Sequence, residues 1–183
     1  PRGTPFASAT PLSRNPCTWS DGTPITAHDV VYSWQRIVNP ATAAPMAYLL
    51  YPIQNASDIA AGRLPPGKLG AEALGDFTVR IHLRAPAPYL LRALCCPTFS
   101  PVPKQAIEAA GQRGNEASWT QPEHIVTSGP FRLRTYDPRD RIVLVPNARH
   151  AEASEIRLRR VSYLFTDDAI VGEAGDLLPM QGR

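Results

Sequence analysis

The sequence predicts an α+β fold in which short helices surround antiparallel hairpins. Proline supplies 20 of the 183 residues, more than twice its average share of about 5%, and so much proline leaves little room for long helices or central strands. One segment has its apolar residues at helical spacing, and several others alternate apolar and polar residues as half-buried strands do. The segments between them are rich in turn residues.

The best-marked helix follows Thr26. Thr26 and Asp29 stand at the spacing of a capping box, and the chain leaves the helix at Asn39 before Pro40. An apolar stripe at positions i, i+1, i+4, i+7 and i+8 lies between these signals: Val30, Val31, Trp34, Ile37 and Val38. We therefore expect an amphipathic helix that ends near residue 38.

Shorter elements follow it. Brief helices are predicted at residues 41–53, Asp58–Gly62, Tyr89–Leu94 and Lys104–Ala110, the last closed by Gly111. Strands are predicted at Phe77–Leu83 and Ile156–Phe165, and a hairpin joins Phe131–Tyr136 to Arg141–Val145 through a turn at 137–140. Trp19, Val30, Trp34 and Phe77 are expected to serve the core.

Composition restricts the function classes. The chain is 43% hydrophobic and 19% charged, and no apolar run approaches the roughly 20 residues of a membrane span. Of 19 basic residues 17 are arginine, and they are scattered, whereas a nucleic-acid footprint needs clustered charge. Solvent-facing arginines on strands are the favoured interpretation, and an arginine-rich nucleic-acid binder remains an alternative.

Catalytic and metal-binding patterns are sparse. His28 and Asp29 are adjacent and Ser20 and Ser33 are near in sequence, but no G-x-S-x-G elbow is present. We favour a capping role for this pair, with a hydrolase using His28 as the alternative. Cys17, Cys95 and Cys96 fit no metal spacing, and the four histidines stand far apart. Cys95 and Cys96 could form a vicinal disulfide, although two small buried hydrophobes are favoured. No catalytic residue, metal or cofactor is expected.

Several sequence blocks together resemble one protein family. Residues 19–36 read WSDGTPITAHDVVYSWQR, and further blocks follow in the same order at 39–45, 69–79, 83–89, 100–104, 119–122, 125–131 and 146–147. This pattern resembles the family 5 extracellular solute-binding proteins of bacterial ABC importers, and the oligopeptide-binding branch most of all. The resemblance covers about residues 19–165.

The resemblance implies a fold and a function. The fold would be part of a two-lobed periplasmic-binding-protein-like structure (class II, cluster C) whose lobes close around a ligand. The chain would capture oligopeptides, bind no nucleic acid, act as a monomer and pass its ligand to an inner-membrane permease. It would lie in the periplasm or on a lipid anchor, although no signal peptide is recognised at residue 1. A dipeptide, nickel complex, opine or sugar is the alternative ligand within the family.

Departures from the family pattern are also informative. Family members are much longer, so the chain is expected to be a truncated or partial copy with impaired binding. Residues 19–125 would be part of the small lobe and 126–165 part of the first main lobe, between irregular segments at 1–18 and 166–183. Family members place an aromatic near the ligand where this chain has Met46 after Pro45. Met46 and the nearby Tyr48 are therefore the candidate ligand-binding residues.

Overall fold

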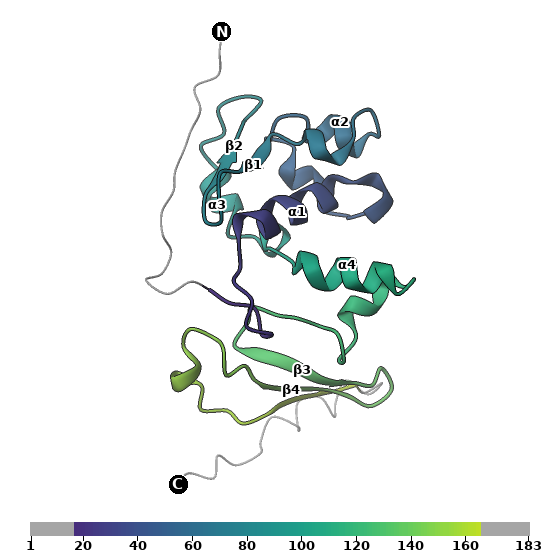
Figure 1. The fold of residues 1–183 in the computed structure, drawn as a ribbon, viewed down its shortest axis with the longest axis vertical. Coiled ribbons are helices and arrows are strands. Elements are labelled where there is room, and N and C mark those ends of the chain that lie inside the picture. Colours follow the sequence, from purple (N-terminus) through teal and green to yellow (C-terminus); the bar gives the residue numbers. More distant parts are fainter. Residues whose placement is uncertain (1–16, 166–183) are drawn as a thin grey trace.

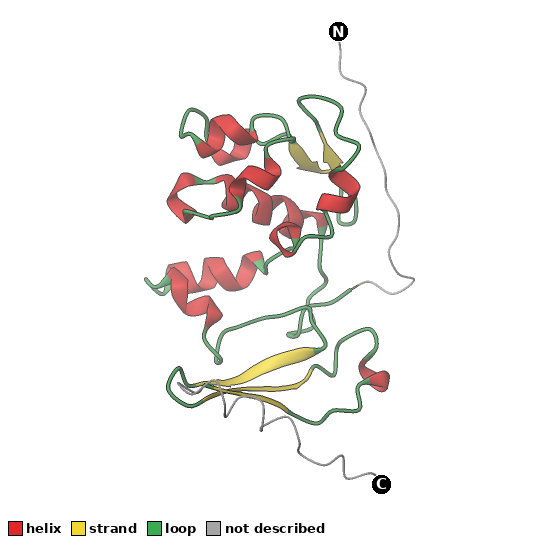
Figure 2. Ribbon diagram, turned by 180° about the vertical axis from the view of Figure 1, so that it is seen from behind, coloured by secondary structure: helices red, strands yellow, loops and turns green. Residues whose placement is uncertain are grey.

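A computed structural model of the chain describes residues 17–165. Helices and a small hairpin lie at one end of the molecule, and a three-stranded sheet lies at the other (Figures 1 and 2). The predicted α+β class with short helices and antiparallel hairpins is confirmed. Predictions for residues 1–16 and 166–183 lie outside the described residues, and Thr18 already pairs with Pro24 in a short antiparallel bridge.

The described helices and strands are all short. The α-helices are α1 (Ala27–Val38), α2 (Ala56–Ala60), α3 (Leu90–Ala93) and α4 (Lys104–Gln112). The strands are β1 (Ala71–Ala73), β2 (Val79–Ile81), β3 (Phe131–Tyr136), β4 (Arg141–Pro146) and β5 (Val161–Leu164). Single 3-10 turns are η1 (Pro40–Thr42), η2 (Ala47–Leu50), η3 (Pro66–Lys68), η4 (Pro97–Phe99), η5 (Glu116–Thr120) and η6 (Ala153–Glu155).

Helix α1 begins and ends as predicted. The capping box is formed: Asp29 Oδ2 accepts the backbone N–H of Thr26 at 2.9 Å. The buried cluster of the molecule includes Trp34 and Val38 from this helix, together with Leu50 and Ile59. Because α1 contacts α2, η2 and the β1–β2 hairpin, it is the central element of the helical layer.

Two helix predictions need correction. Residues 41–53 form the separate turns η1 and η2, because Ala43 between them adopts a left-handed conformation (φ 50°) that interrupts any helix. Helix α4 passes through Gly111, and the positive φ that favours glycine occurs at Gly114 (79°) instead.

The hairpin of β3 and β4 is confirmed, but the other strands are shorter than predicted. Strand β2 covers only Val79–Ile81 because its partner β1 is three residues long. Strand β5 starts at Val161, opposite Leu144, and β4 ends two residues later at Pro146, so residues 156–160 have little partner backbone. A bulge in β3 between Leu133 and Thr135 shifts the register and ends the predicted alternation of buried and exposed side chains.

Burial contradicts two further expectations. Trp19 and Trp34 are buried, but Phe77 lies in the turn before β2 and is 68% exposed. The three cysteines are free thiols, with Cys17 and Cys95 exposed and Cys96 half-buried, so the adjacent pair is not a buried one. Both errors concern residues in or beside turns at the surface, where no neighbouring element within residues 17–165 packs over an apolar side chain.

Candidate functional site

Two α1 side chains, Ser33 and Trp34, attach the helix to segment 99–104. Ser33 Oγ donates to the Asp29 carbonyl at 2.6 Å and accepts the Val102 N–H at 2.7 Å. The indole Nε1 of Trp34 donates to the Phe99 carbonyl at 3.0 Å, and the two rings meet edge to face. Buried polar groups satisfied in this way fix the position of segment 99–104 against α1. This attachment fixes Ser100 and Val102, which line one of two hollows on this side of α1.

Met46 directly precedes η2, Tyr48 lies within it, and the two side chains touch. Met46 is 42% and Tyr48 is 53% exposed, and the Tyr48 hydroxyl donates to Met46 Sδ at 3.5 Å. Large apolar side chains left in solvent in this way are not part of the core, which suits residues that contact another molecule. The two candidates are therefore brought together, although they line different hollows.

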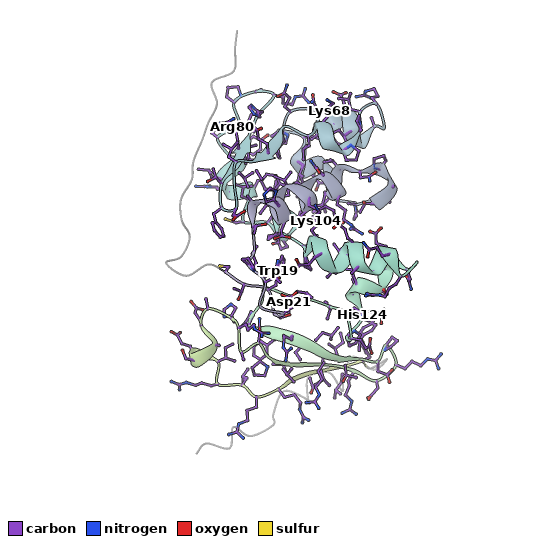
Figure 3. The ribbon with its side chains drawn as sticks, viewed as in Figure 1. Trp19, Asp21, Lys68, Arg80, Lys104 and His124 are labelled. Atoms are coloured by element: carbon purple, nitrogen blue, oxygen red, sulfur yellow. The ribbon has the colours of Figure 1, made fainter. Side chains whose placement is uncertain are left out.

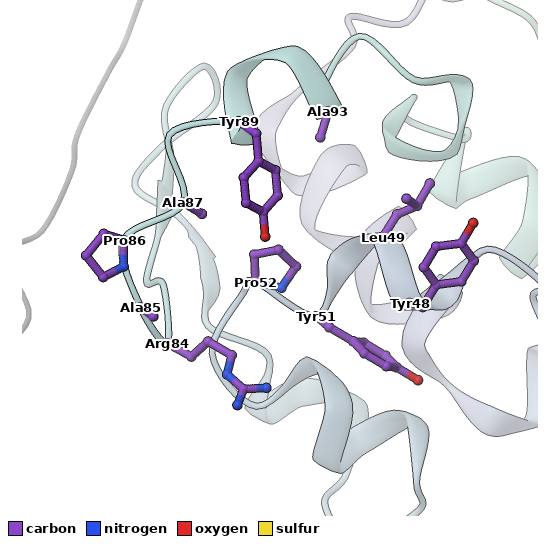
Figure 4. Close-up of a pocket in the computed structure, with 10 residues that line it drawn as sticks. All are labelled: Tyr48, Leu49, Tyr51, Pro52, Arg84, Ala85, Pro86, Ala87, Tyr89 and Ala93. Carbon is purple, nitrogen blue, oxygen red and sulfur yellow. The ribbon is translucent and has the colours of Figure 1, made fainter.

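The first hollow holds about 480 Å³. Its lining residues come from two segments: Tyr48, Leu49, Tyr51 and Pro52 from the first, and Arg84, Ala85, Pro86, Ala87, Tyr89 and Ala93 from the second. Figure 4 shows the Tyr89 ring pointing toward Pro52, with Arg84 and Pro86 on one side and Tyr48 on the other. The volume is in the range of small-ligand sites, about 300–1,000 Å³.

The second hollow holds about 290 Å³. Its lining residues are Ser33, Arg36 and Ile37 of α1, Ala44–Met46, Pro97, Thr98, Ser100 and Val102. Arg36 is the one charged residue here, and its Nη2 lies 2.6 Å from Glu116 Oε1. The two hollows therefore share the same pair of wall segments, residues 44–52 and residues 84–102.

Sequence reasoning missed the first hollow. More than thirty residues of sequence separate Tyr51 from Arg84 and Tyr89. The three side chains meet because the backbone pairs beside them: the Arg84 N–H donates to the Pro52 carbonyl at 3.0 Å. The available signal was compositional: residues 48–52 read YLLYP and 84–89 read RAPAPY, two segments rich in tyrosine and proline.

Electrostatic perturbations lie outside the hollows. Burial raises the pKa of Tyr32, whose ring lies 5.9 Å from the Lys104 ammonium. Hydrogen bonds from His82 and Arg80 lower the pKa of Glu72 on the β1–β2 hairpin. Hydrogen bonding with the backbone and then the side chain of Thr98 lowers the pKa of the Cys96 thiol. None of these groups lines either hollow.

Among residues 17–165, the structure does not assemble a hydrolase site at His28. Its side chain is exposed. The hydroxyls of Ser20 and Ser33 are buried and bond to backbone groups, the former accepting the Thr127 N–H at 3.2 Å. Within residues 17–165, no group of three His, Cys, Asp or Glu side chains is placed to hold a metal ion. In the same range no helix has the length and apolar character needed to cross a bilayer.

A polar junction connects the helical layer to the three-stranded sheet, and Trp19 and Asp21 mark it in Figure 3. Arg149 Nη1 donates to the Ser20 carbonyl at 3.0 Å, and Thr18 Oγ1 donates to the Arg149 carbonyl at 3.2 Å. Gly22 has a φ of +96°, and Arg149 Nε would lie 3.0 Å from a Cβ there, so a side chain would be strained and crowded. Arg149 therefore joins the two layers through contacts of both its side chain and its backbone.

The arginines of the sheet are exposed. Arg132 and Arg134 of β3 and Arg141 of β4 all project into solvent, as predicted for scattered arginines on strands. Arg141 pairs with the adjacent Asp140 at 2.6 Å, which raises the pKa of the guanidinium further. The basic residues on these strands are therefore ordinary solvated side chains.

Comparison with known families and proteins gives a consistent result. Residues 14–174 match the family model described as bacterial extracellular solute-binding proteins, family 5 Middle. The periplasmic oligopeptide-binding protein OppA of Salmonella typhimurium is 45% identical over 153 residues, which cover 82% of this chain and 27% of the relative. The probable deoxycholate-binding periplasmic protein YgiS of Escherichia coli is 37% identical over 161 residues, 87% of this chain and 29% of the relative.

Solved structures agree with these sequence matches. The crystal structure of Haemophilus influenzae OppA in complex with the peptide RPPGFSPFR superposes with a TM-score of 0.80 at 30% identity, covering 93% of this chain and 35% of that chain. The chain thus spans 27% to 35% of the length of these relatives. The predicted resemblance and the predicted relation to periplasmic binding proteins are confirmed.

Proposed function

Because the chain belongs to the family 5 bacterial extracellular solute-binding proteins, we propose that it takes part in capturing oligopeptides for an ABC importer. The observation that carries this proposal is the 45% identity to a periplasmic oligopeptide-binding protein. The matched family region, residues 14–174, contains both segments that line the two hollows. The proposed role is binding and delivery without covalent chemistry.

Met46 and Tyr48 are the proposed peptide contacts. Both are exposed, they touch each other, and each lines one of two apolar hollows. Open hollows with apolar walls can accept side chains of varied shape, while water satisfies the remaining polar groups of an extended peptide. A peptide lying along residues 44–52 would meet both hollows in succession.

The proposed setting follows the family. The chain would work in the periplasm, or on a lipid anchor at the cell surface, as a monomer that delivers its ligand to an inner-membrane permease. It would have no enzymatic activity and no nucleic-acid partner. These proposals rest on relatives named as periplasmic binding proteins.

A different solute is the second candidate. YgiS, which is 37% identical, is named as a probable deoxycholate-binding protein. The mainly apolar lining of both hollows favours this candidate as well, since it would also suit an apolar ligand other than a peptide. Separate calorimetric titrations with a tripeptide and with deoxycholate would distinguish the two candidates by which compound binds more tightly.

We expect the 183-residue chain by itself to bind peptides weakly. Both hollows lie at the surface with exposed lining residues, so a bound peptide stays partly solvated and gains little from burial. Isothermal titration calorimetry with a tri- to pentapeptide should show binding weaker than micromolar. Micromolar or tighter binding would contradict the proposed impairment, although it would support peptide capture.

A chimera tests the function itself. Residues 19–165 would replace the matched segment of the Salmonella relative, and peptide affinity would be measured by calorimetry. We expect the chimera to bind, and the Met46→Ala/Tyr48→Ala chimera to bind more weakly. Leu74→Ala provides the control, since Leu74 is 46% exposed and lines neither hollow. A folded chimera that binds no peptide would overturn the proposal.

A further inference from the structure

The first hollow is built from rigid groups. Tyr48, Tyr51 and Tyr89 line it together with two prolines, and Tyr48 and Tyr89 remain more than half exposed. Aromatic side chains offer a large apolar surface and lose little conformational freedom when a ligand binds. The exposure of Tyr48 and Tyr89 shows that core packing does not account for these two rings, whereas Tyr51 also packs against the buried cluster.

The two walls of the hollow are held together by backbone contacts. The Arg84 N–H donates to the Pro52 carbonyl at 3.0 Å, and Ile53 pairs with Leu83 in an antiparallel bridge. On the second wall, the Leu90 N–H donates to the Ala87 carbonyl at 3.0 Å, so Tyr89 is fixed at the start of α3. The hollow is therefore present before any ligand arrives, which lowers the entropy cost of binding.

The charge of the hollow is unbalanced. Arg84 is the one charged residue among its lining residues, and no carboxylate is among them. Within the described part of the chain Arg84 is in none of the ion pairs, whereas Arg36 of the second hollow is neutralised by Glu116. A guanidinium beside apolar walls attracts a carboxylate that carries an apolar group.

We propose that the first hollow binds the C-terminal residue of a peptide, with an apolar or aromatic side chain against the tyrosines and its free carboxylate on Arg84. This assignment rests on the proposed function and adds a preference to it. The second hollow, with its neutralised arginine, would accept an interior residue that has no free carboxylate. Figure 4 shows the arrangement, with Arg84 extending from the wall opposite Tyr48.

The test uses the full chain and two small probes, N-acetylphenylalanine and N-acetylphenylalaninamide, which differ only in the carboxylate. Binding is followed by the shifts of backbone amide signals in NMR titrations. The acid should shift signals of residues 48–52 and 84–93 and bind about fivefold more tightly than the amide, the difference between a charged and a neutral hydrogen-bond partner. Added salt should weaken binding of the acid more than that of the amide.

Two substitutions complete the design. Arg84→Gln keeps a hydrogen-bond donor but removes the charge, and it should make the acid and the amide bind equally. Arg92→Gln is the matched control, because Arg92 lies exposed on α3 and does not line the hollow. The proposal is overturned if wild type binds both probes equally or binds neither, if the shifts lie elsewhere, or if Arg92→Gln has the effect expected of Arg84→Gln.

The outcome is separable from that of the peptide-binding test. If the chimera binds peptides but the acid and amide probes bind equally here, only the carboxylate preference fails. If the acid probe binds at Arg84 while the chimera binds no peptide, the hollow is an apolar-carboxylate site and peptide capture fails.

Discussion

The helical layer and the three-stranded sheet differ sharply in how they bury apolar side chains. The main buried cluster draws all its members from residues between Trp34 and Phe99. The sheet of β3–β5 contributes none of them, and three of the four residues of β5 are exposed. Tyr163 and Leu164 of β5 are each more than half exposed. The apolar side chains of the helical layer are therefore enclosed, whereas many of those on the sheet stay open to solvent.

This difference shows where the stability of the described residues comes from. Hydrophobic stabilisation is proportional to the apolar area removed from water, so the helical layer should supply most of it. A small sheet with little buried surface depends on its hydrogen-bond ladders and on its attachment to the rest of the protein. The polar junction around Ser20, Thr127 and Arg149 provides that attachment.

The largest expected effect comes from opening the buried cluster. Ile59 of α2 has no exposed surface, and Ile59→Ala should lower the free energy of unfolding by about 2–5 kcal/mol, because it removes buried methyl groups and leaves a cavity. Urea unfolding followed by far-UV circular dichroism measures the loss.

Leu144→Ala is the matched substitution in the sheet. Leu144 of β4 is half-buried and pairs with both Leu133 and Val161, so its truncation should cost clearly less than that of Ile59. Equal losses for the two variants would mean that the sheet is as well packed as the helical layer, and the comparison would be wrong.

A smaller effect is expected at the junction. Arg149→Ala removes the hydrogen bond to the Ser20 carbonyl and should lower the free energy of unfolding by about 1 kcal/mol. Tryptophan fluorescence would report it, since Trp19 is 2% exposed at this junction. Arg139→Ala, in the exposed hairpin turn, should leave the unfolding midpoint unchanged; a similar drop in both variants would argue against a specific attachment.

The smallest effect is a pH dependence on the β1–β2 hairpin. Hydrogen bonds from His82 and Arg80 lower the pKa of Glu72 below its ordinary value of 4.5. The ionised carboxylate therefore stabilises the folded state above that value, and the contribution is lost as the pH falls through the lowered pKa. Wild type should exceed Glu72→Gln in unfolding midpoint at pH 6 and converge with it in acid. Glu123→Gln, whose exposed carboxylate has no ion-pair partner in residues 17–165, should show no such convergence.

Much of the fold was predictable because local signals were strong. The capping box at Thr26 and Asp29 and the stripe of α1 agree, and the turn at 137–140 joins two alternating segments, so α1 and the β3–β4 hairpin were found with near-correct ends. The errors at residues 77 and 156–160 arose because the length of a strand is set by its partner strand and not by its own sequence alone. Ala43 broke a predicted helix by a conformation that propensity does not favour.

The candidate site was only partly predictable. Met46 and Tyr48 were identified by their position in a family pattern, but that pattern did not reveal which side chains surround them. Arg84 and Tyr89 lie across from Pro52 only because residues 53 and 83 pair. Their charge and aromatic character were visible in the sequence, whereas their convergence on one hollow was not.

The sequence by itself determined the α+β class, the central helix and the family, because capping, periodicity and ordered motifs are local properties of the chain. Only the tertiary structure decided that Phe77 and Cys95 are exposed, that Arg149 connects the two layers, and that Arg84 stands without a carboxylate partner among the described residues. These are properties of distant segments meeting in space, where burial and charge balance depend on every neighbour at once.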